Sequence, residues 1–144
     1  MPETNKISVG IVGGAGYTAG ELIRILLYHP AAELKYIQST SNNGLRVSSV
    51  HTDLLGDTDL IFRDIDYNDI DVVFLCSGHG KSIDYLNNTE IPQRVKIIDL
   101  SHDFRLKRAG NDFVYGLPEL TAGKSGQQPK LPIPDVLPLQ FSWH

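Results

Sequence analysis

The feature that most constrains this chain is a glycine cluster that separates a short apolar run from an amphipathic segment. The apolar run, residues 7–12 (ISVGIV), is typical of a strand buried on both faces of a parallel sheet. Beyond the cluster, leucine and isoleucine recur at helical spacing between positions 22 and 27, which predicts a helix over residues 16–28. A strand, a glycine turn and a helix in this order form the setting in which a glycine motif is able to hold a dinucleotide.

Two further signals mark the ends of the predicted helix. Thr18 is followed three residues later by Glu21, which is the spacing of a capping box, so Thr18 is the expected N-cap. Pro30 disfavours helical backbone at the residue before it, so the helix is expected to end near His29.

The rest of the chain alternates between expected strands and helices. Strands are predicted over residues 34–40, 59–64, 71–76 and 95–100, and a second helix is predicted over residues 81–87. Residues 41–56 are polar and irregular, with one short helix expected over residues 45–50. This alternation predicts an α/β fold with a doubly wound, mostly parallel sheet of the Rossmann type. The expected division is one domain over residues 1–120 and an irregular, proline-rich tail over residues 121–144.

The composition excludes several classes of protein. The 144 residues carry a net charge of −4, which does not favour binding to nucleic acid or to an anionic membrane. The single cysteine excludes a disulfide framework and a cysteine-rich zinc site, and no metal is expected. The polar first residues do not resemble a signal peptide, and no apolar run is long enough to cross a bilayer, so a cytoplasmic location is expected.

The glycine cluster fits the GxGxxG/A pattern of dinucleotide-binding turns. Small residues allow backbone N–H groups to approach a pyrophosphate at a helix N-terminus, where the aligned peptide dipoles favour an anion. The alternative is a glycine turn with a structural role alone. The cofactor interpretation assigns this contact to Gly13, Gly14, Ala15, Gly16, Tyr17, Thr18 and Ala19.

The end of the second predicted strand bears on the choice of cofactor. NAD sites usually place an acidic residue there to bind the ribose 2′-hydroxyl, and this chain has none. Hydroxyl and amide groups are able to bind a 2′-phosphate, and an arginine lies close in sequence, so NADP is favoured over NAD. The alternative is the polar start of a loop. The residues assigned to the adenosine end are Ser39, Thr40, Ser41 and Arg46.

A second glycine turn follows the strongly apolar strand predicted over residues 71–76. Ser77, Gly78 and Gly80 are expected to lie along the cofactor, because ligands bind at the carboxyl ends of strands in open α/β sheets. Cys76 ends a buried apolar run, so we interpret it as a small apolar residue and not as a nucleophile. His79 is interpreted as a residue at the start of a helix and not as a catalytic base.

A polar cluster, DLSHDFR, follows the last predicted strand at residues 99–105. It places a hydroxyl group, carboxylates and an arginine at a strand's carboxyl end, which is suited to an anionic substrate. Arg105 is the best single candidate, because a guanidinium matches the geometry of phosphate and carboxylate groups. The alternative is an exposed turn with local ion pairs.

Five segments occur here in the order found in N-acetyl-gamma-glutamyl-phosphate reductases of arginine biosynthesis, and the chain resembles that family from Lys6 to about Leu120. The segments are GIVGGAGYTAGELIRILLYHP, HTDLLG, SGHGKS, DLSHDFR and VYGLPEL. The resemblance implies that NADPH reduces a small-molecule acyl phosphate to N-acetylglutamate 5-semialdehyde, with release of phosphate. It also implies a nucleophilic cysteine, an acid/base histidine from a second domain, and a homo-oligomer.

The resemblance also implies roles for individual residues. It places Ser101, Asp103 and Arg105 near the substrate and Glu119 beside the reactive centre. Two alternatives stay open. The glycine motif alone also fits aspartate-semialdehyde dehydrogenases, and a non-catalytic NADP-binding module would carry the same motif.

The chain departs from that family after Leu120. The family continues to an Ala-Asn-Pro-Gly-Cys motif that carries the nucleophile, whereas residues 130–144 are KLPIPDVLPLQFSWH. One synonymous coding sequence for these residues, read in a shifted frame, encodes the missing motif. We therefore expect a frameshift between Leu120 and Lys130. Because the nucleophilic cysteine and the catalytic and dimerisation domain are missing, no catalytic residue is assigned and this chain is expected to be inactive.

Overall fold

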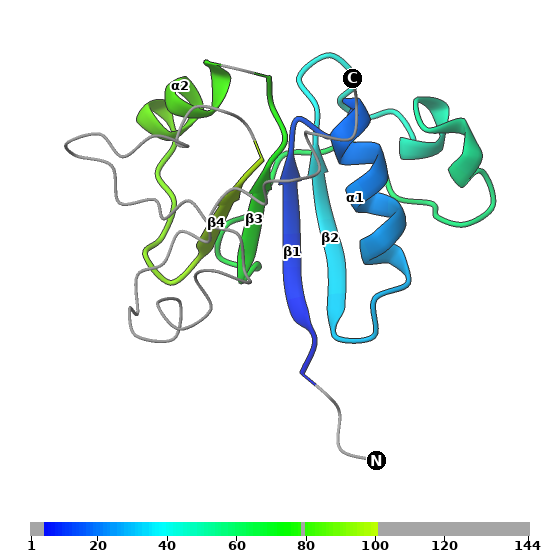
Figure 1. Cartoon of the computed structure of the whole chain (residues 1–144), viewed down its shortest axis with the longest axis horizontal. Coiled ribbons are helices and arrows are strands. Elements are labelled where there is room, and N and C mark those ends of the chain that lie inside the picture. The colour runs from blue at the N-terminus through cyan, green and yellow to red at the C-terminus, as the bar shows by residue number, and fades with distance from the viewer. Residues whose placement is uncertain (1–4, 79, 101–144) are drawn as a thin grey trace, which may run out of the picture.

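A four-stranded sheet forms the centre of the computed structural model, which describes residues 5–78 and 80–100 (Figure 1). Every neighbouring pair of strands is parallel. The spatial order is β2-β1-β3-β4. The strands are β1 (Ile7–Val12), β2 (Ala32–Gln38), β3 (Val72–Leu75) and β4 (Lys96–Asp99). This arrangement confirms the predicted α/β class with a parallel sheet.

The central strand β1 is buried on both faces, as its continuous apolar sequence predicts. Ile11 belongs to a core cluster that includes Ile23 of α1 (Tyr17–Leu27), and both side chains are fully buried. Val12 faces the other way and packs in a second cluster with Val73. The strand therefore joins two apolar layers and fixes the position of the turn that follows it.

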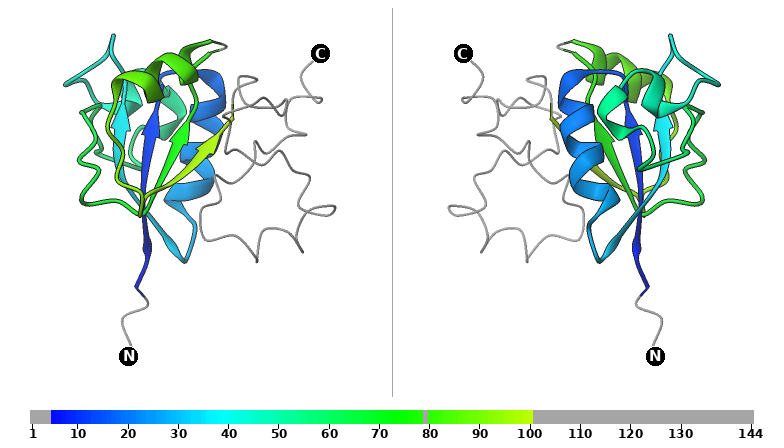
Figure 2. Two further views of the ribbon diagram at one scale, coloured as in Figure 1. Left: turned by 90° about the vertical axis from the view of Figure 1, so that its left-hand side faces the viewer. Right: turned by 90° about the vertical axis from the view of Figure 1, so that its right-hand side faces the viewer.

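The helices lie on different sides of the sheet (Figure 2). While α1 packs on one face, α2 (Lys81–Asn88) contacts the cluster of the other face through Tyr85 and Leu86. Two 3-10 helices, η1 (Val47–Ser49) and η2 (Thr52–Leu54), follow β2 and lie beside α1. The short helix expected over residues 45–50 thus corresponds to η1.

The helix α1 begins within the predicted range, but the predicted N-cap, Thr18, is wrong. Gly16 is the N-cap, and the Gly20 N–H already donates to the Gly16 carbonyl at 3.0 Å. Thr18 therefore lies inside the first turn and not at its boundary. Glu21 does not complete a capping box; its carboxylate accepts a hydrogen bond from Arg24 at 3.0 Å. The backbone geometry of the glycine turn sets this helix start.

The strand predicted over residues 59–64 does not form as a ladder. Phe62 makes an isolated parallel bridge to Ile37, and Ile61 makes an isolated antiparallel bridge to Arg46. Adjacent residues thus pair with two different segments, so no single partner extends a ladder. Phe62 is nevertheless fully buried, which explains the apolar character of this stretch.

The connections on either side of β1 create an opening at the carboxyl ends of the strands. The chain passes from β1 to β2 on one side, and β3 then pairs with the opposite side of β1. The turns after β1 and β3 therefore face each other at the point where open α/β sheets bind ligands. Every helix within residues 5–78 and 80–100 is too short or too polar to span a bilayer.

Several predictions lie outside the described residues. They concern the start-of-helix residue His79, the substrate residues Ser101, Asp103, Arg105 and Glu119, and the tail over residues 121–144.

Candidate cofactor site

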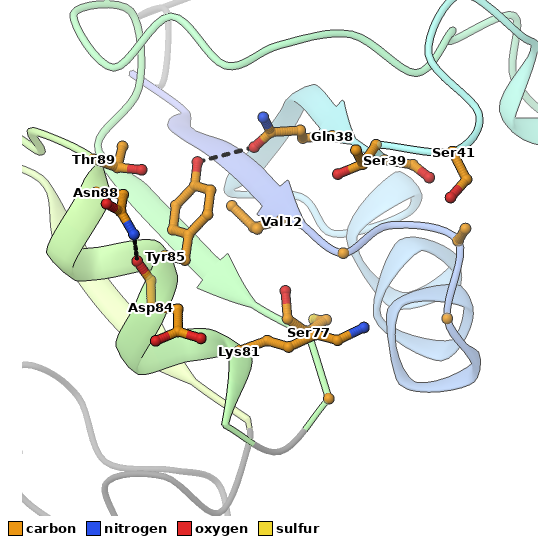
Figure 3. A pocket seen from close by; sticks show the side chains of 16 residues that line it. Val12, Gln38, Ser39, Ser41, Ser77, Lys81, Asp84, Tyr85, Asn88 and Thr89 are labelled. Atoms are coloured by element: carbon orange, nitrogen blue, oxygen red, sulfur yellow. Dashed lines mark hydrogen bonds between the residues drawn. The ribbon is translucent and has the colours of Figure 1, made fainter.

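A cavity of about 570 Å³ lies at the carboxyl ends of β1, β2 and β3 and extends along α2 (Figure 3). Many of the residues that were assigned to the cofactor from the sequence line it. They are Gly13, Ala15, Gly16, Ser39, Thr40, Ser41, Ser77 and Gly78. The structure therefore brings the two glycine turns and the end of β2 around one opening.

The two glycine turns are in close contact. Gly13 has a φ of +75°, and a Cβ added there would lie 2.8 Å from the Ser77 backbone nitrogen. The Gly16 N–H donates to the Gly13 carbonyl at 3.3 Å, which closes the first turn. As the N-cap of α1, Gly16 also places the positive end of the helix dipole at the cavity. This end of the cavity is suited to an anion.

Gly14 is needed for packing, because it lies directly against β2. Its N–H donates to the Gln38 carbonyl at 2.8 Å, and a Cβ would lie 2.1 Å from Cγ2 of Ile37. Gly14 is not part of the cavity lining, although the sequence analysis assigned it to the cofactor. Four other residues assigned to the cofactor also lie outside the lining. These are Tyr17, Thr18, Ala19 and Gly80.

Arg46 lies outside the cavity lining and pairs with Asp59. Its Nη1 atom is 3.2 Å from Oδ1 of Asp59, and the two side chains are 65% and 92% exposed. An ion pair this exposed contributes little to stability. The pair therefore does not lock the arginine in place.

One wall of the cavity comes from a helix face that the sequence analysis did not single out. Its members are Lys81, Asp84, Tyr85 and Asn88, followed by Thr89. The spacing 81, 84, 85 and 88 is that of a single helical face, and it begins directly after the second glycine turn. This periodicity, combined with the turn, could have identified the wall.

Tyr85 connects this wall to the end of β2. Its hydroxyl group donates to Oε1 of Gln38 at 2.9 Å and also hydrogen-bonds the Tyr67 hydroxyl. Nε2 of Gln38 donates to Oδ1 of Asp64 at 3.1 Å. Burial raises the pKa of Tyr85, so the hydroxyl stays protonated as a donor. This network fixes the Gln38 amide and the backbone that leads into the hydroxyl-rich loop.

Lys81 is the only lysine or arginine among the described residues that line the cavity. Its side chain extends from the start of α2 into the opening (Figure 3). No ion pair with another described residue neutralises its ammonium group. Ser82, the next residue, is fully buried and donates to Oδ1 of the buried Asp99 at 2.9 Å. This bond ties the start of α2 to β4 and so holds Lys81 at the cavity.

Cys76 is half-buried and lines the cavity. Burial raises the pKa of its thiol to about 12, and the negative charge of Asp99 adds to the shift. Because the thiolate is the nucleophile, a thiol with this pKa is poorly suited to covalent catalysis at neutral pH. Among the described residues, no three His, Cys, Asp or Glu side chains gather in a way that could hold a metal ion.

The comparison with known families agrees with this geometry. Residues 8–127 match the family described as semialdehyde dehydrogenase, NAD binding domain. The chain belongs to this family. The family description names NAD binding, which agrees with the nicotinamide cofactor expected from the sequence.

Relatives at higher identity share a more specific name. This semialdehyde dehydrogenase domain is 50% identical over 115 residues to N-acetyl-gamma-glutamyl-phosphate reductase of Phocaeicola vulgatus and 53% identical over 115 residues to that of Parabacteroides distasonis. Both matches cover 79% of this chain and 36% of the relative. The predicted resemblance is confirmed over this part. The chain spans about a third of the length of these curated relatives, 36%.

Solved structures show the same fold. The aspartate semialdehyde dehydrogenase of Candida albicans with NADP superposes with a TM-score of 0.60 at 14% identity, covering 88% of this chain and 41% of that one. The aspartate semialdehyde dehydrogenase II of Vibrio cholerae gives a TM-score of 0.58 at 14% identity, covering 82% of this chain and 34% of that one. At this identity, the likeness concerns the fold alone.

Proposed function

We propose that this chain is the cofactor-binding part of an NADPH-dependent reductase that converts N-acetyl-gamma-glutamyl phosphate to N-acetylglutamate 5-semialdehyde with release of phosphate. The observation that carries the proposal is the identity of 50–53% to reductases of that name across the segment that builds the cavity. An aspartate-semialdehyde dehydrogenase-type reductase has weaker support, because the solved examples share only 14% identity with this chain.

The residues around the cavity fit the chemical groups of NADP. The N-terminus of α1 and the neighbouring glycine turn suit the pyrophosphate, as helix N-termini do in dinucleotide sites. The hydroxyl-bearing residues Ser39, Thr40 and Ser41 line the cavity after the end of β2, and no acidic residue at that strand end opposes a 2′-phosphate. The bound cofactor would supply the hydride, and this domain would bind and orient it.

The preference for NADP is tested by titrating the 144-residue chain with NADPH and with NADH. We expect NADPH to bind at least about tenfold more tightly, because the hydroxyl-rich loop would contact its 2′-phosphate. Competition by 2′-AMP and not by 5′-AMP would support the same assignment. Equal affinities for NADPH and NADH would contradict the preference for NADP, and the failure of both to bind would contradict the proposed function.

We also propose that the chemistry of the reductase needs a cysteine that this sequence does not carry. Its single cysteine, Cys76, has a raised thiol pKa and lies within the fold. The frameshift proposed between Leu120 and Lys130 would account for the missing Ala-Asn-Pro-Gly-Cys motif. Sequencing the DNA tests this, since the restored frame must encode the motif. Acyl-phosphate reduction by the purified 144-residue chain would overturn the proposal.

The substrate side of the proposal rests on residues beyond the described part of the chain. We propose that Ser101, Asp103 and Arg105 bind the acyl phosphate and that Glu119 lies beside the reactive centre. The predicted boundary near residue 120, the homo-oligomeric state and the cytoplasmic location likewise stay predictions. A charge-removing substitution, Arg105→Met, in a frame-restored protein should raise the KM for the acyl phosphate and leave NADPH affinity unchanged.

A further inference from the structure

His51 makes a buried contact with the glycine turn that the proposed function does not use. Its imidazole is only 8% exposed, and Nε2 lies 2.7 Å from the Gly14 carbonyl oxygen. A carbonyl oxygen only accepts hydrogen bonds, so Nε2 must carry the proton and donate it. The contact joins residues that are 37 positions apart in the sequence.

A glycine in α1 provides the space for this ring. A Cβ added to Gly20 would lie 2.8 Å from Nδ1 and 2.9 Å from Cε1 of His51. Glycine is unfavourable in the middle of a helix compared with alanine, so its presence here requires a reason. The close approach of the imidazole supplies that reason.

The segment that carries His51 is anchored on both sides. The His51 N–H donates to the Val47 carbonyl at 2.9 Å, and the Leu54 N–H donates to the His51 carbonyl at 3.0 Å. Val47 and Leu54 are both buried in the core cluster shared with α1. Asp53 adds a hydrogen bond of 2.8 Å from Nη2 of Arg24. The imidazole is therefore held in place by its own backbone and neighbours.

The bond to Gly14 also determines where the next backbone N–H points. The Gly14 carbonyl and the Ala15 N–H belong to one trans peptide unit, and in such a unit the two groups point in opposite directions. Because His51 holds the carbonyl on its own side, the N–H is directed to the other side. Ala15 lines the cavity, and within residues 5–78 and 80–100 its N–H has no hydrogen-bond partner.

We infer that His51 is a positioning residue of the cofactor site, which holds the Gly14–Ala15 peptide so that the Ala15 N–H faces a phosphate group of the dinucleotide. The inference rests on the proposed cofactor role of the cavity. It gives the HTDLLG segment a structural role at the glycine turn: His51 orients the turn, Asp53 pairs with Arg24 of α1, and Leu54 packs in the core.

The test uses His51→Leu and His51→Gln in the 144-residue chain. Leucine removes the donor, whereas glutamine retains an N–H at a similar distance from the backbone. We expect His51→Leu to weaken NADPH binding about tenfold, which is the scale of one hydrogen bond, and His51→Gln to recover most of the loss. Binding of 2′-AMP, which lacks the pyrophosphate, should change less than about twofold.

The second ligand distinguishes positioning from general damage to the fold. An equal loss of NADPH and 2′-AMP affinity, or no loss of NADPH affinity in His51→Leu, would overturn the inference. Absence of NADPH binding by the wild-type chain would overturn both the inference and the proposed function. Binding that is insensitive to His51→Leu would leave the proposed function standing and remove only the positioning role.

Two measurements keep the inference testable if His51→Leu fails to fold. Nitrogen-15 spectra of the wild-type imidazole should show a protonated Nε2, and an unprotonated Nε2 would overturn the inference. Gly20→Ala should displace the ring while favouring the helix, so we expect it to weaken NADPH binding and to spare 2′-AMP. Unchanged NADPH affinity in Gly20→Ala would count against the inference.

Discussion

A Cβ on Gly13 would lie 2.8 Å from the backbone nitrogen of Ser77. The turn after β1 and the turn after β3 are therefore in close contact, and both residues line the cavity. The same glycine has a φ of +75°, which residues with a side chain rarely adopt. Two independent requirements therefore select glycine at this position.

We expect Gly13→Ala to destabilise the fold by about 3 kcal/mol, from left-handed backbone strain together with overpacking. The matched control is Gly44→Ala. Gly44 has a similar φ of +86° but no heavy atom within 4 Å of an added Cβ, so strain alone should cost about 1 kcal/mol. Urea unfolding of both variants measures the difference, and equal losses would show that the two turns are not in close contact.

We expect Lys81→Met to weaken the binding of NADPH and of NADH by the same factor, about tenfold. The stability of the fold, measured by urea unfolding, should not change. The two cofactors share the pyrophosphate, so an equal loss would place the lysine there, whereas a loss confined to NADPH would place it at the 2′-phosphate. Binding should also depend less steeply on salt in the variant. Lys96→Met, at the opposite end of β4 from the cavity, is the control and should leave both affinities unchanged.

We expect Cys76 to react slowly with iodoacetamide in the folded chain at pH about 8 and rapidly in urea, because its thiol pKa is about 12 in the fold and only the thiolate reacts. Mass spectrometry gives both rates. Equal rates in the folded and unfolded chain would contradict the enclosed position of the thiol, and would reopen its interpretation as a nucleophile.

The Arg24–Asp53 pair predicts a dependence of stability on pH. The hydrogen bond from Arg24 lowers the pKa of Asp53 in the folded chain. As the pH falls, Asp53 is therefore protonated in the unfolded chain before it is protonated in the folded chain. The stabilisation from this carboxylate is complete above the ordinary aspartate pKa of about 4, and it is lost as the pH falls through the lowered pKa of the folded chain. We expect Asp53→Asn to flatten the fall in unfolding free energy between about pH 6 and about pH 3.

Arg24→Met provides the complementary measurement for that pair. It removes the partner and leaves the carboxylate, so it should flatten the same part of the pH profile. Urea titrations across the pH range compare the three proteins. A steep profile retained in either variant would show that other carboxylates govern the acid transition.

Local patterns in the sequence were sufficient to predict the strand β1, the helix α1 and the turns that line the cavity. Ile11 and Ile23 could be placed from periodicity, and Gly13 and Ser77 from their positions at strand ends. The N-cap of α1 was mispredicted at Thr18 from its capping-box spacing, whereas the carbonyl of Gly16 in the glycine turn accepts the first hydrogen bond of the helix.

The residues that sequence reasoning missed are joined by non-local contacts. The bond of Tyr85 to Gln38 crosses 47 positions, and the bond of His51 to Gly14 crosses 37. Periodicity along one chain reports which face of an element is buried, and it does not report which distant side chain that face meets. Lys81 was missed for a different reason, since the glycine pattern of its turn ends before the helical face that carries it.

The docking of the segment that contains η1 and η2 against α1 links ligand binding to local unfolding. Suppose that NADPH binds only when His51 holds the glycine turn. Docking of residues 47–54 then makes NADPH binding more favourable, and NADPH makes docking more favourable by the same free energy. Saturating NADPH should therefore slow amide hydrogen exchange at Val47 and Leu54, although neither residue lines the cavity. The opening rate of a segment whose Val47 and Leu54 lie outside the cavity lining would then report whether the cavity is occupied.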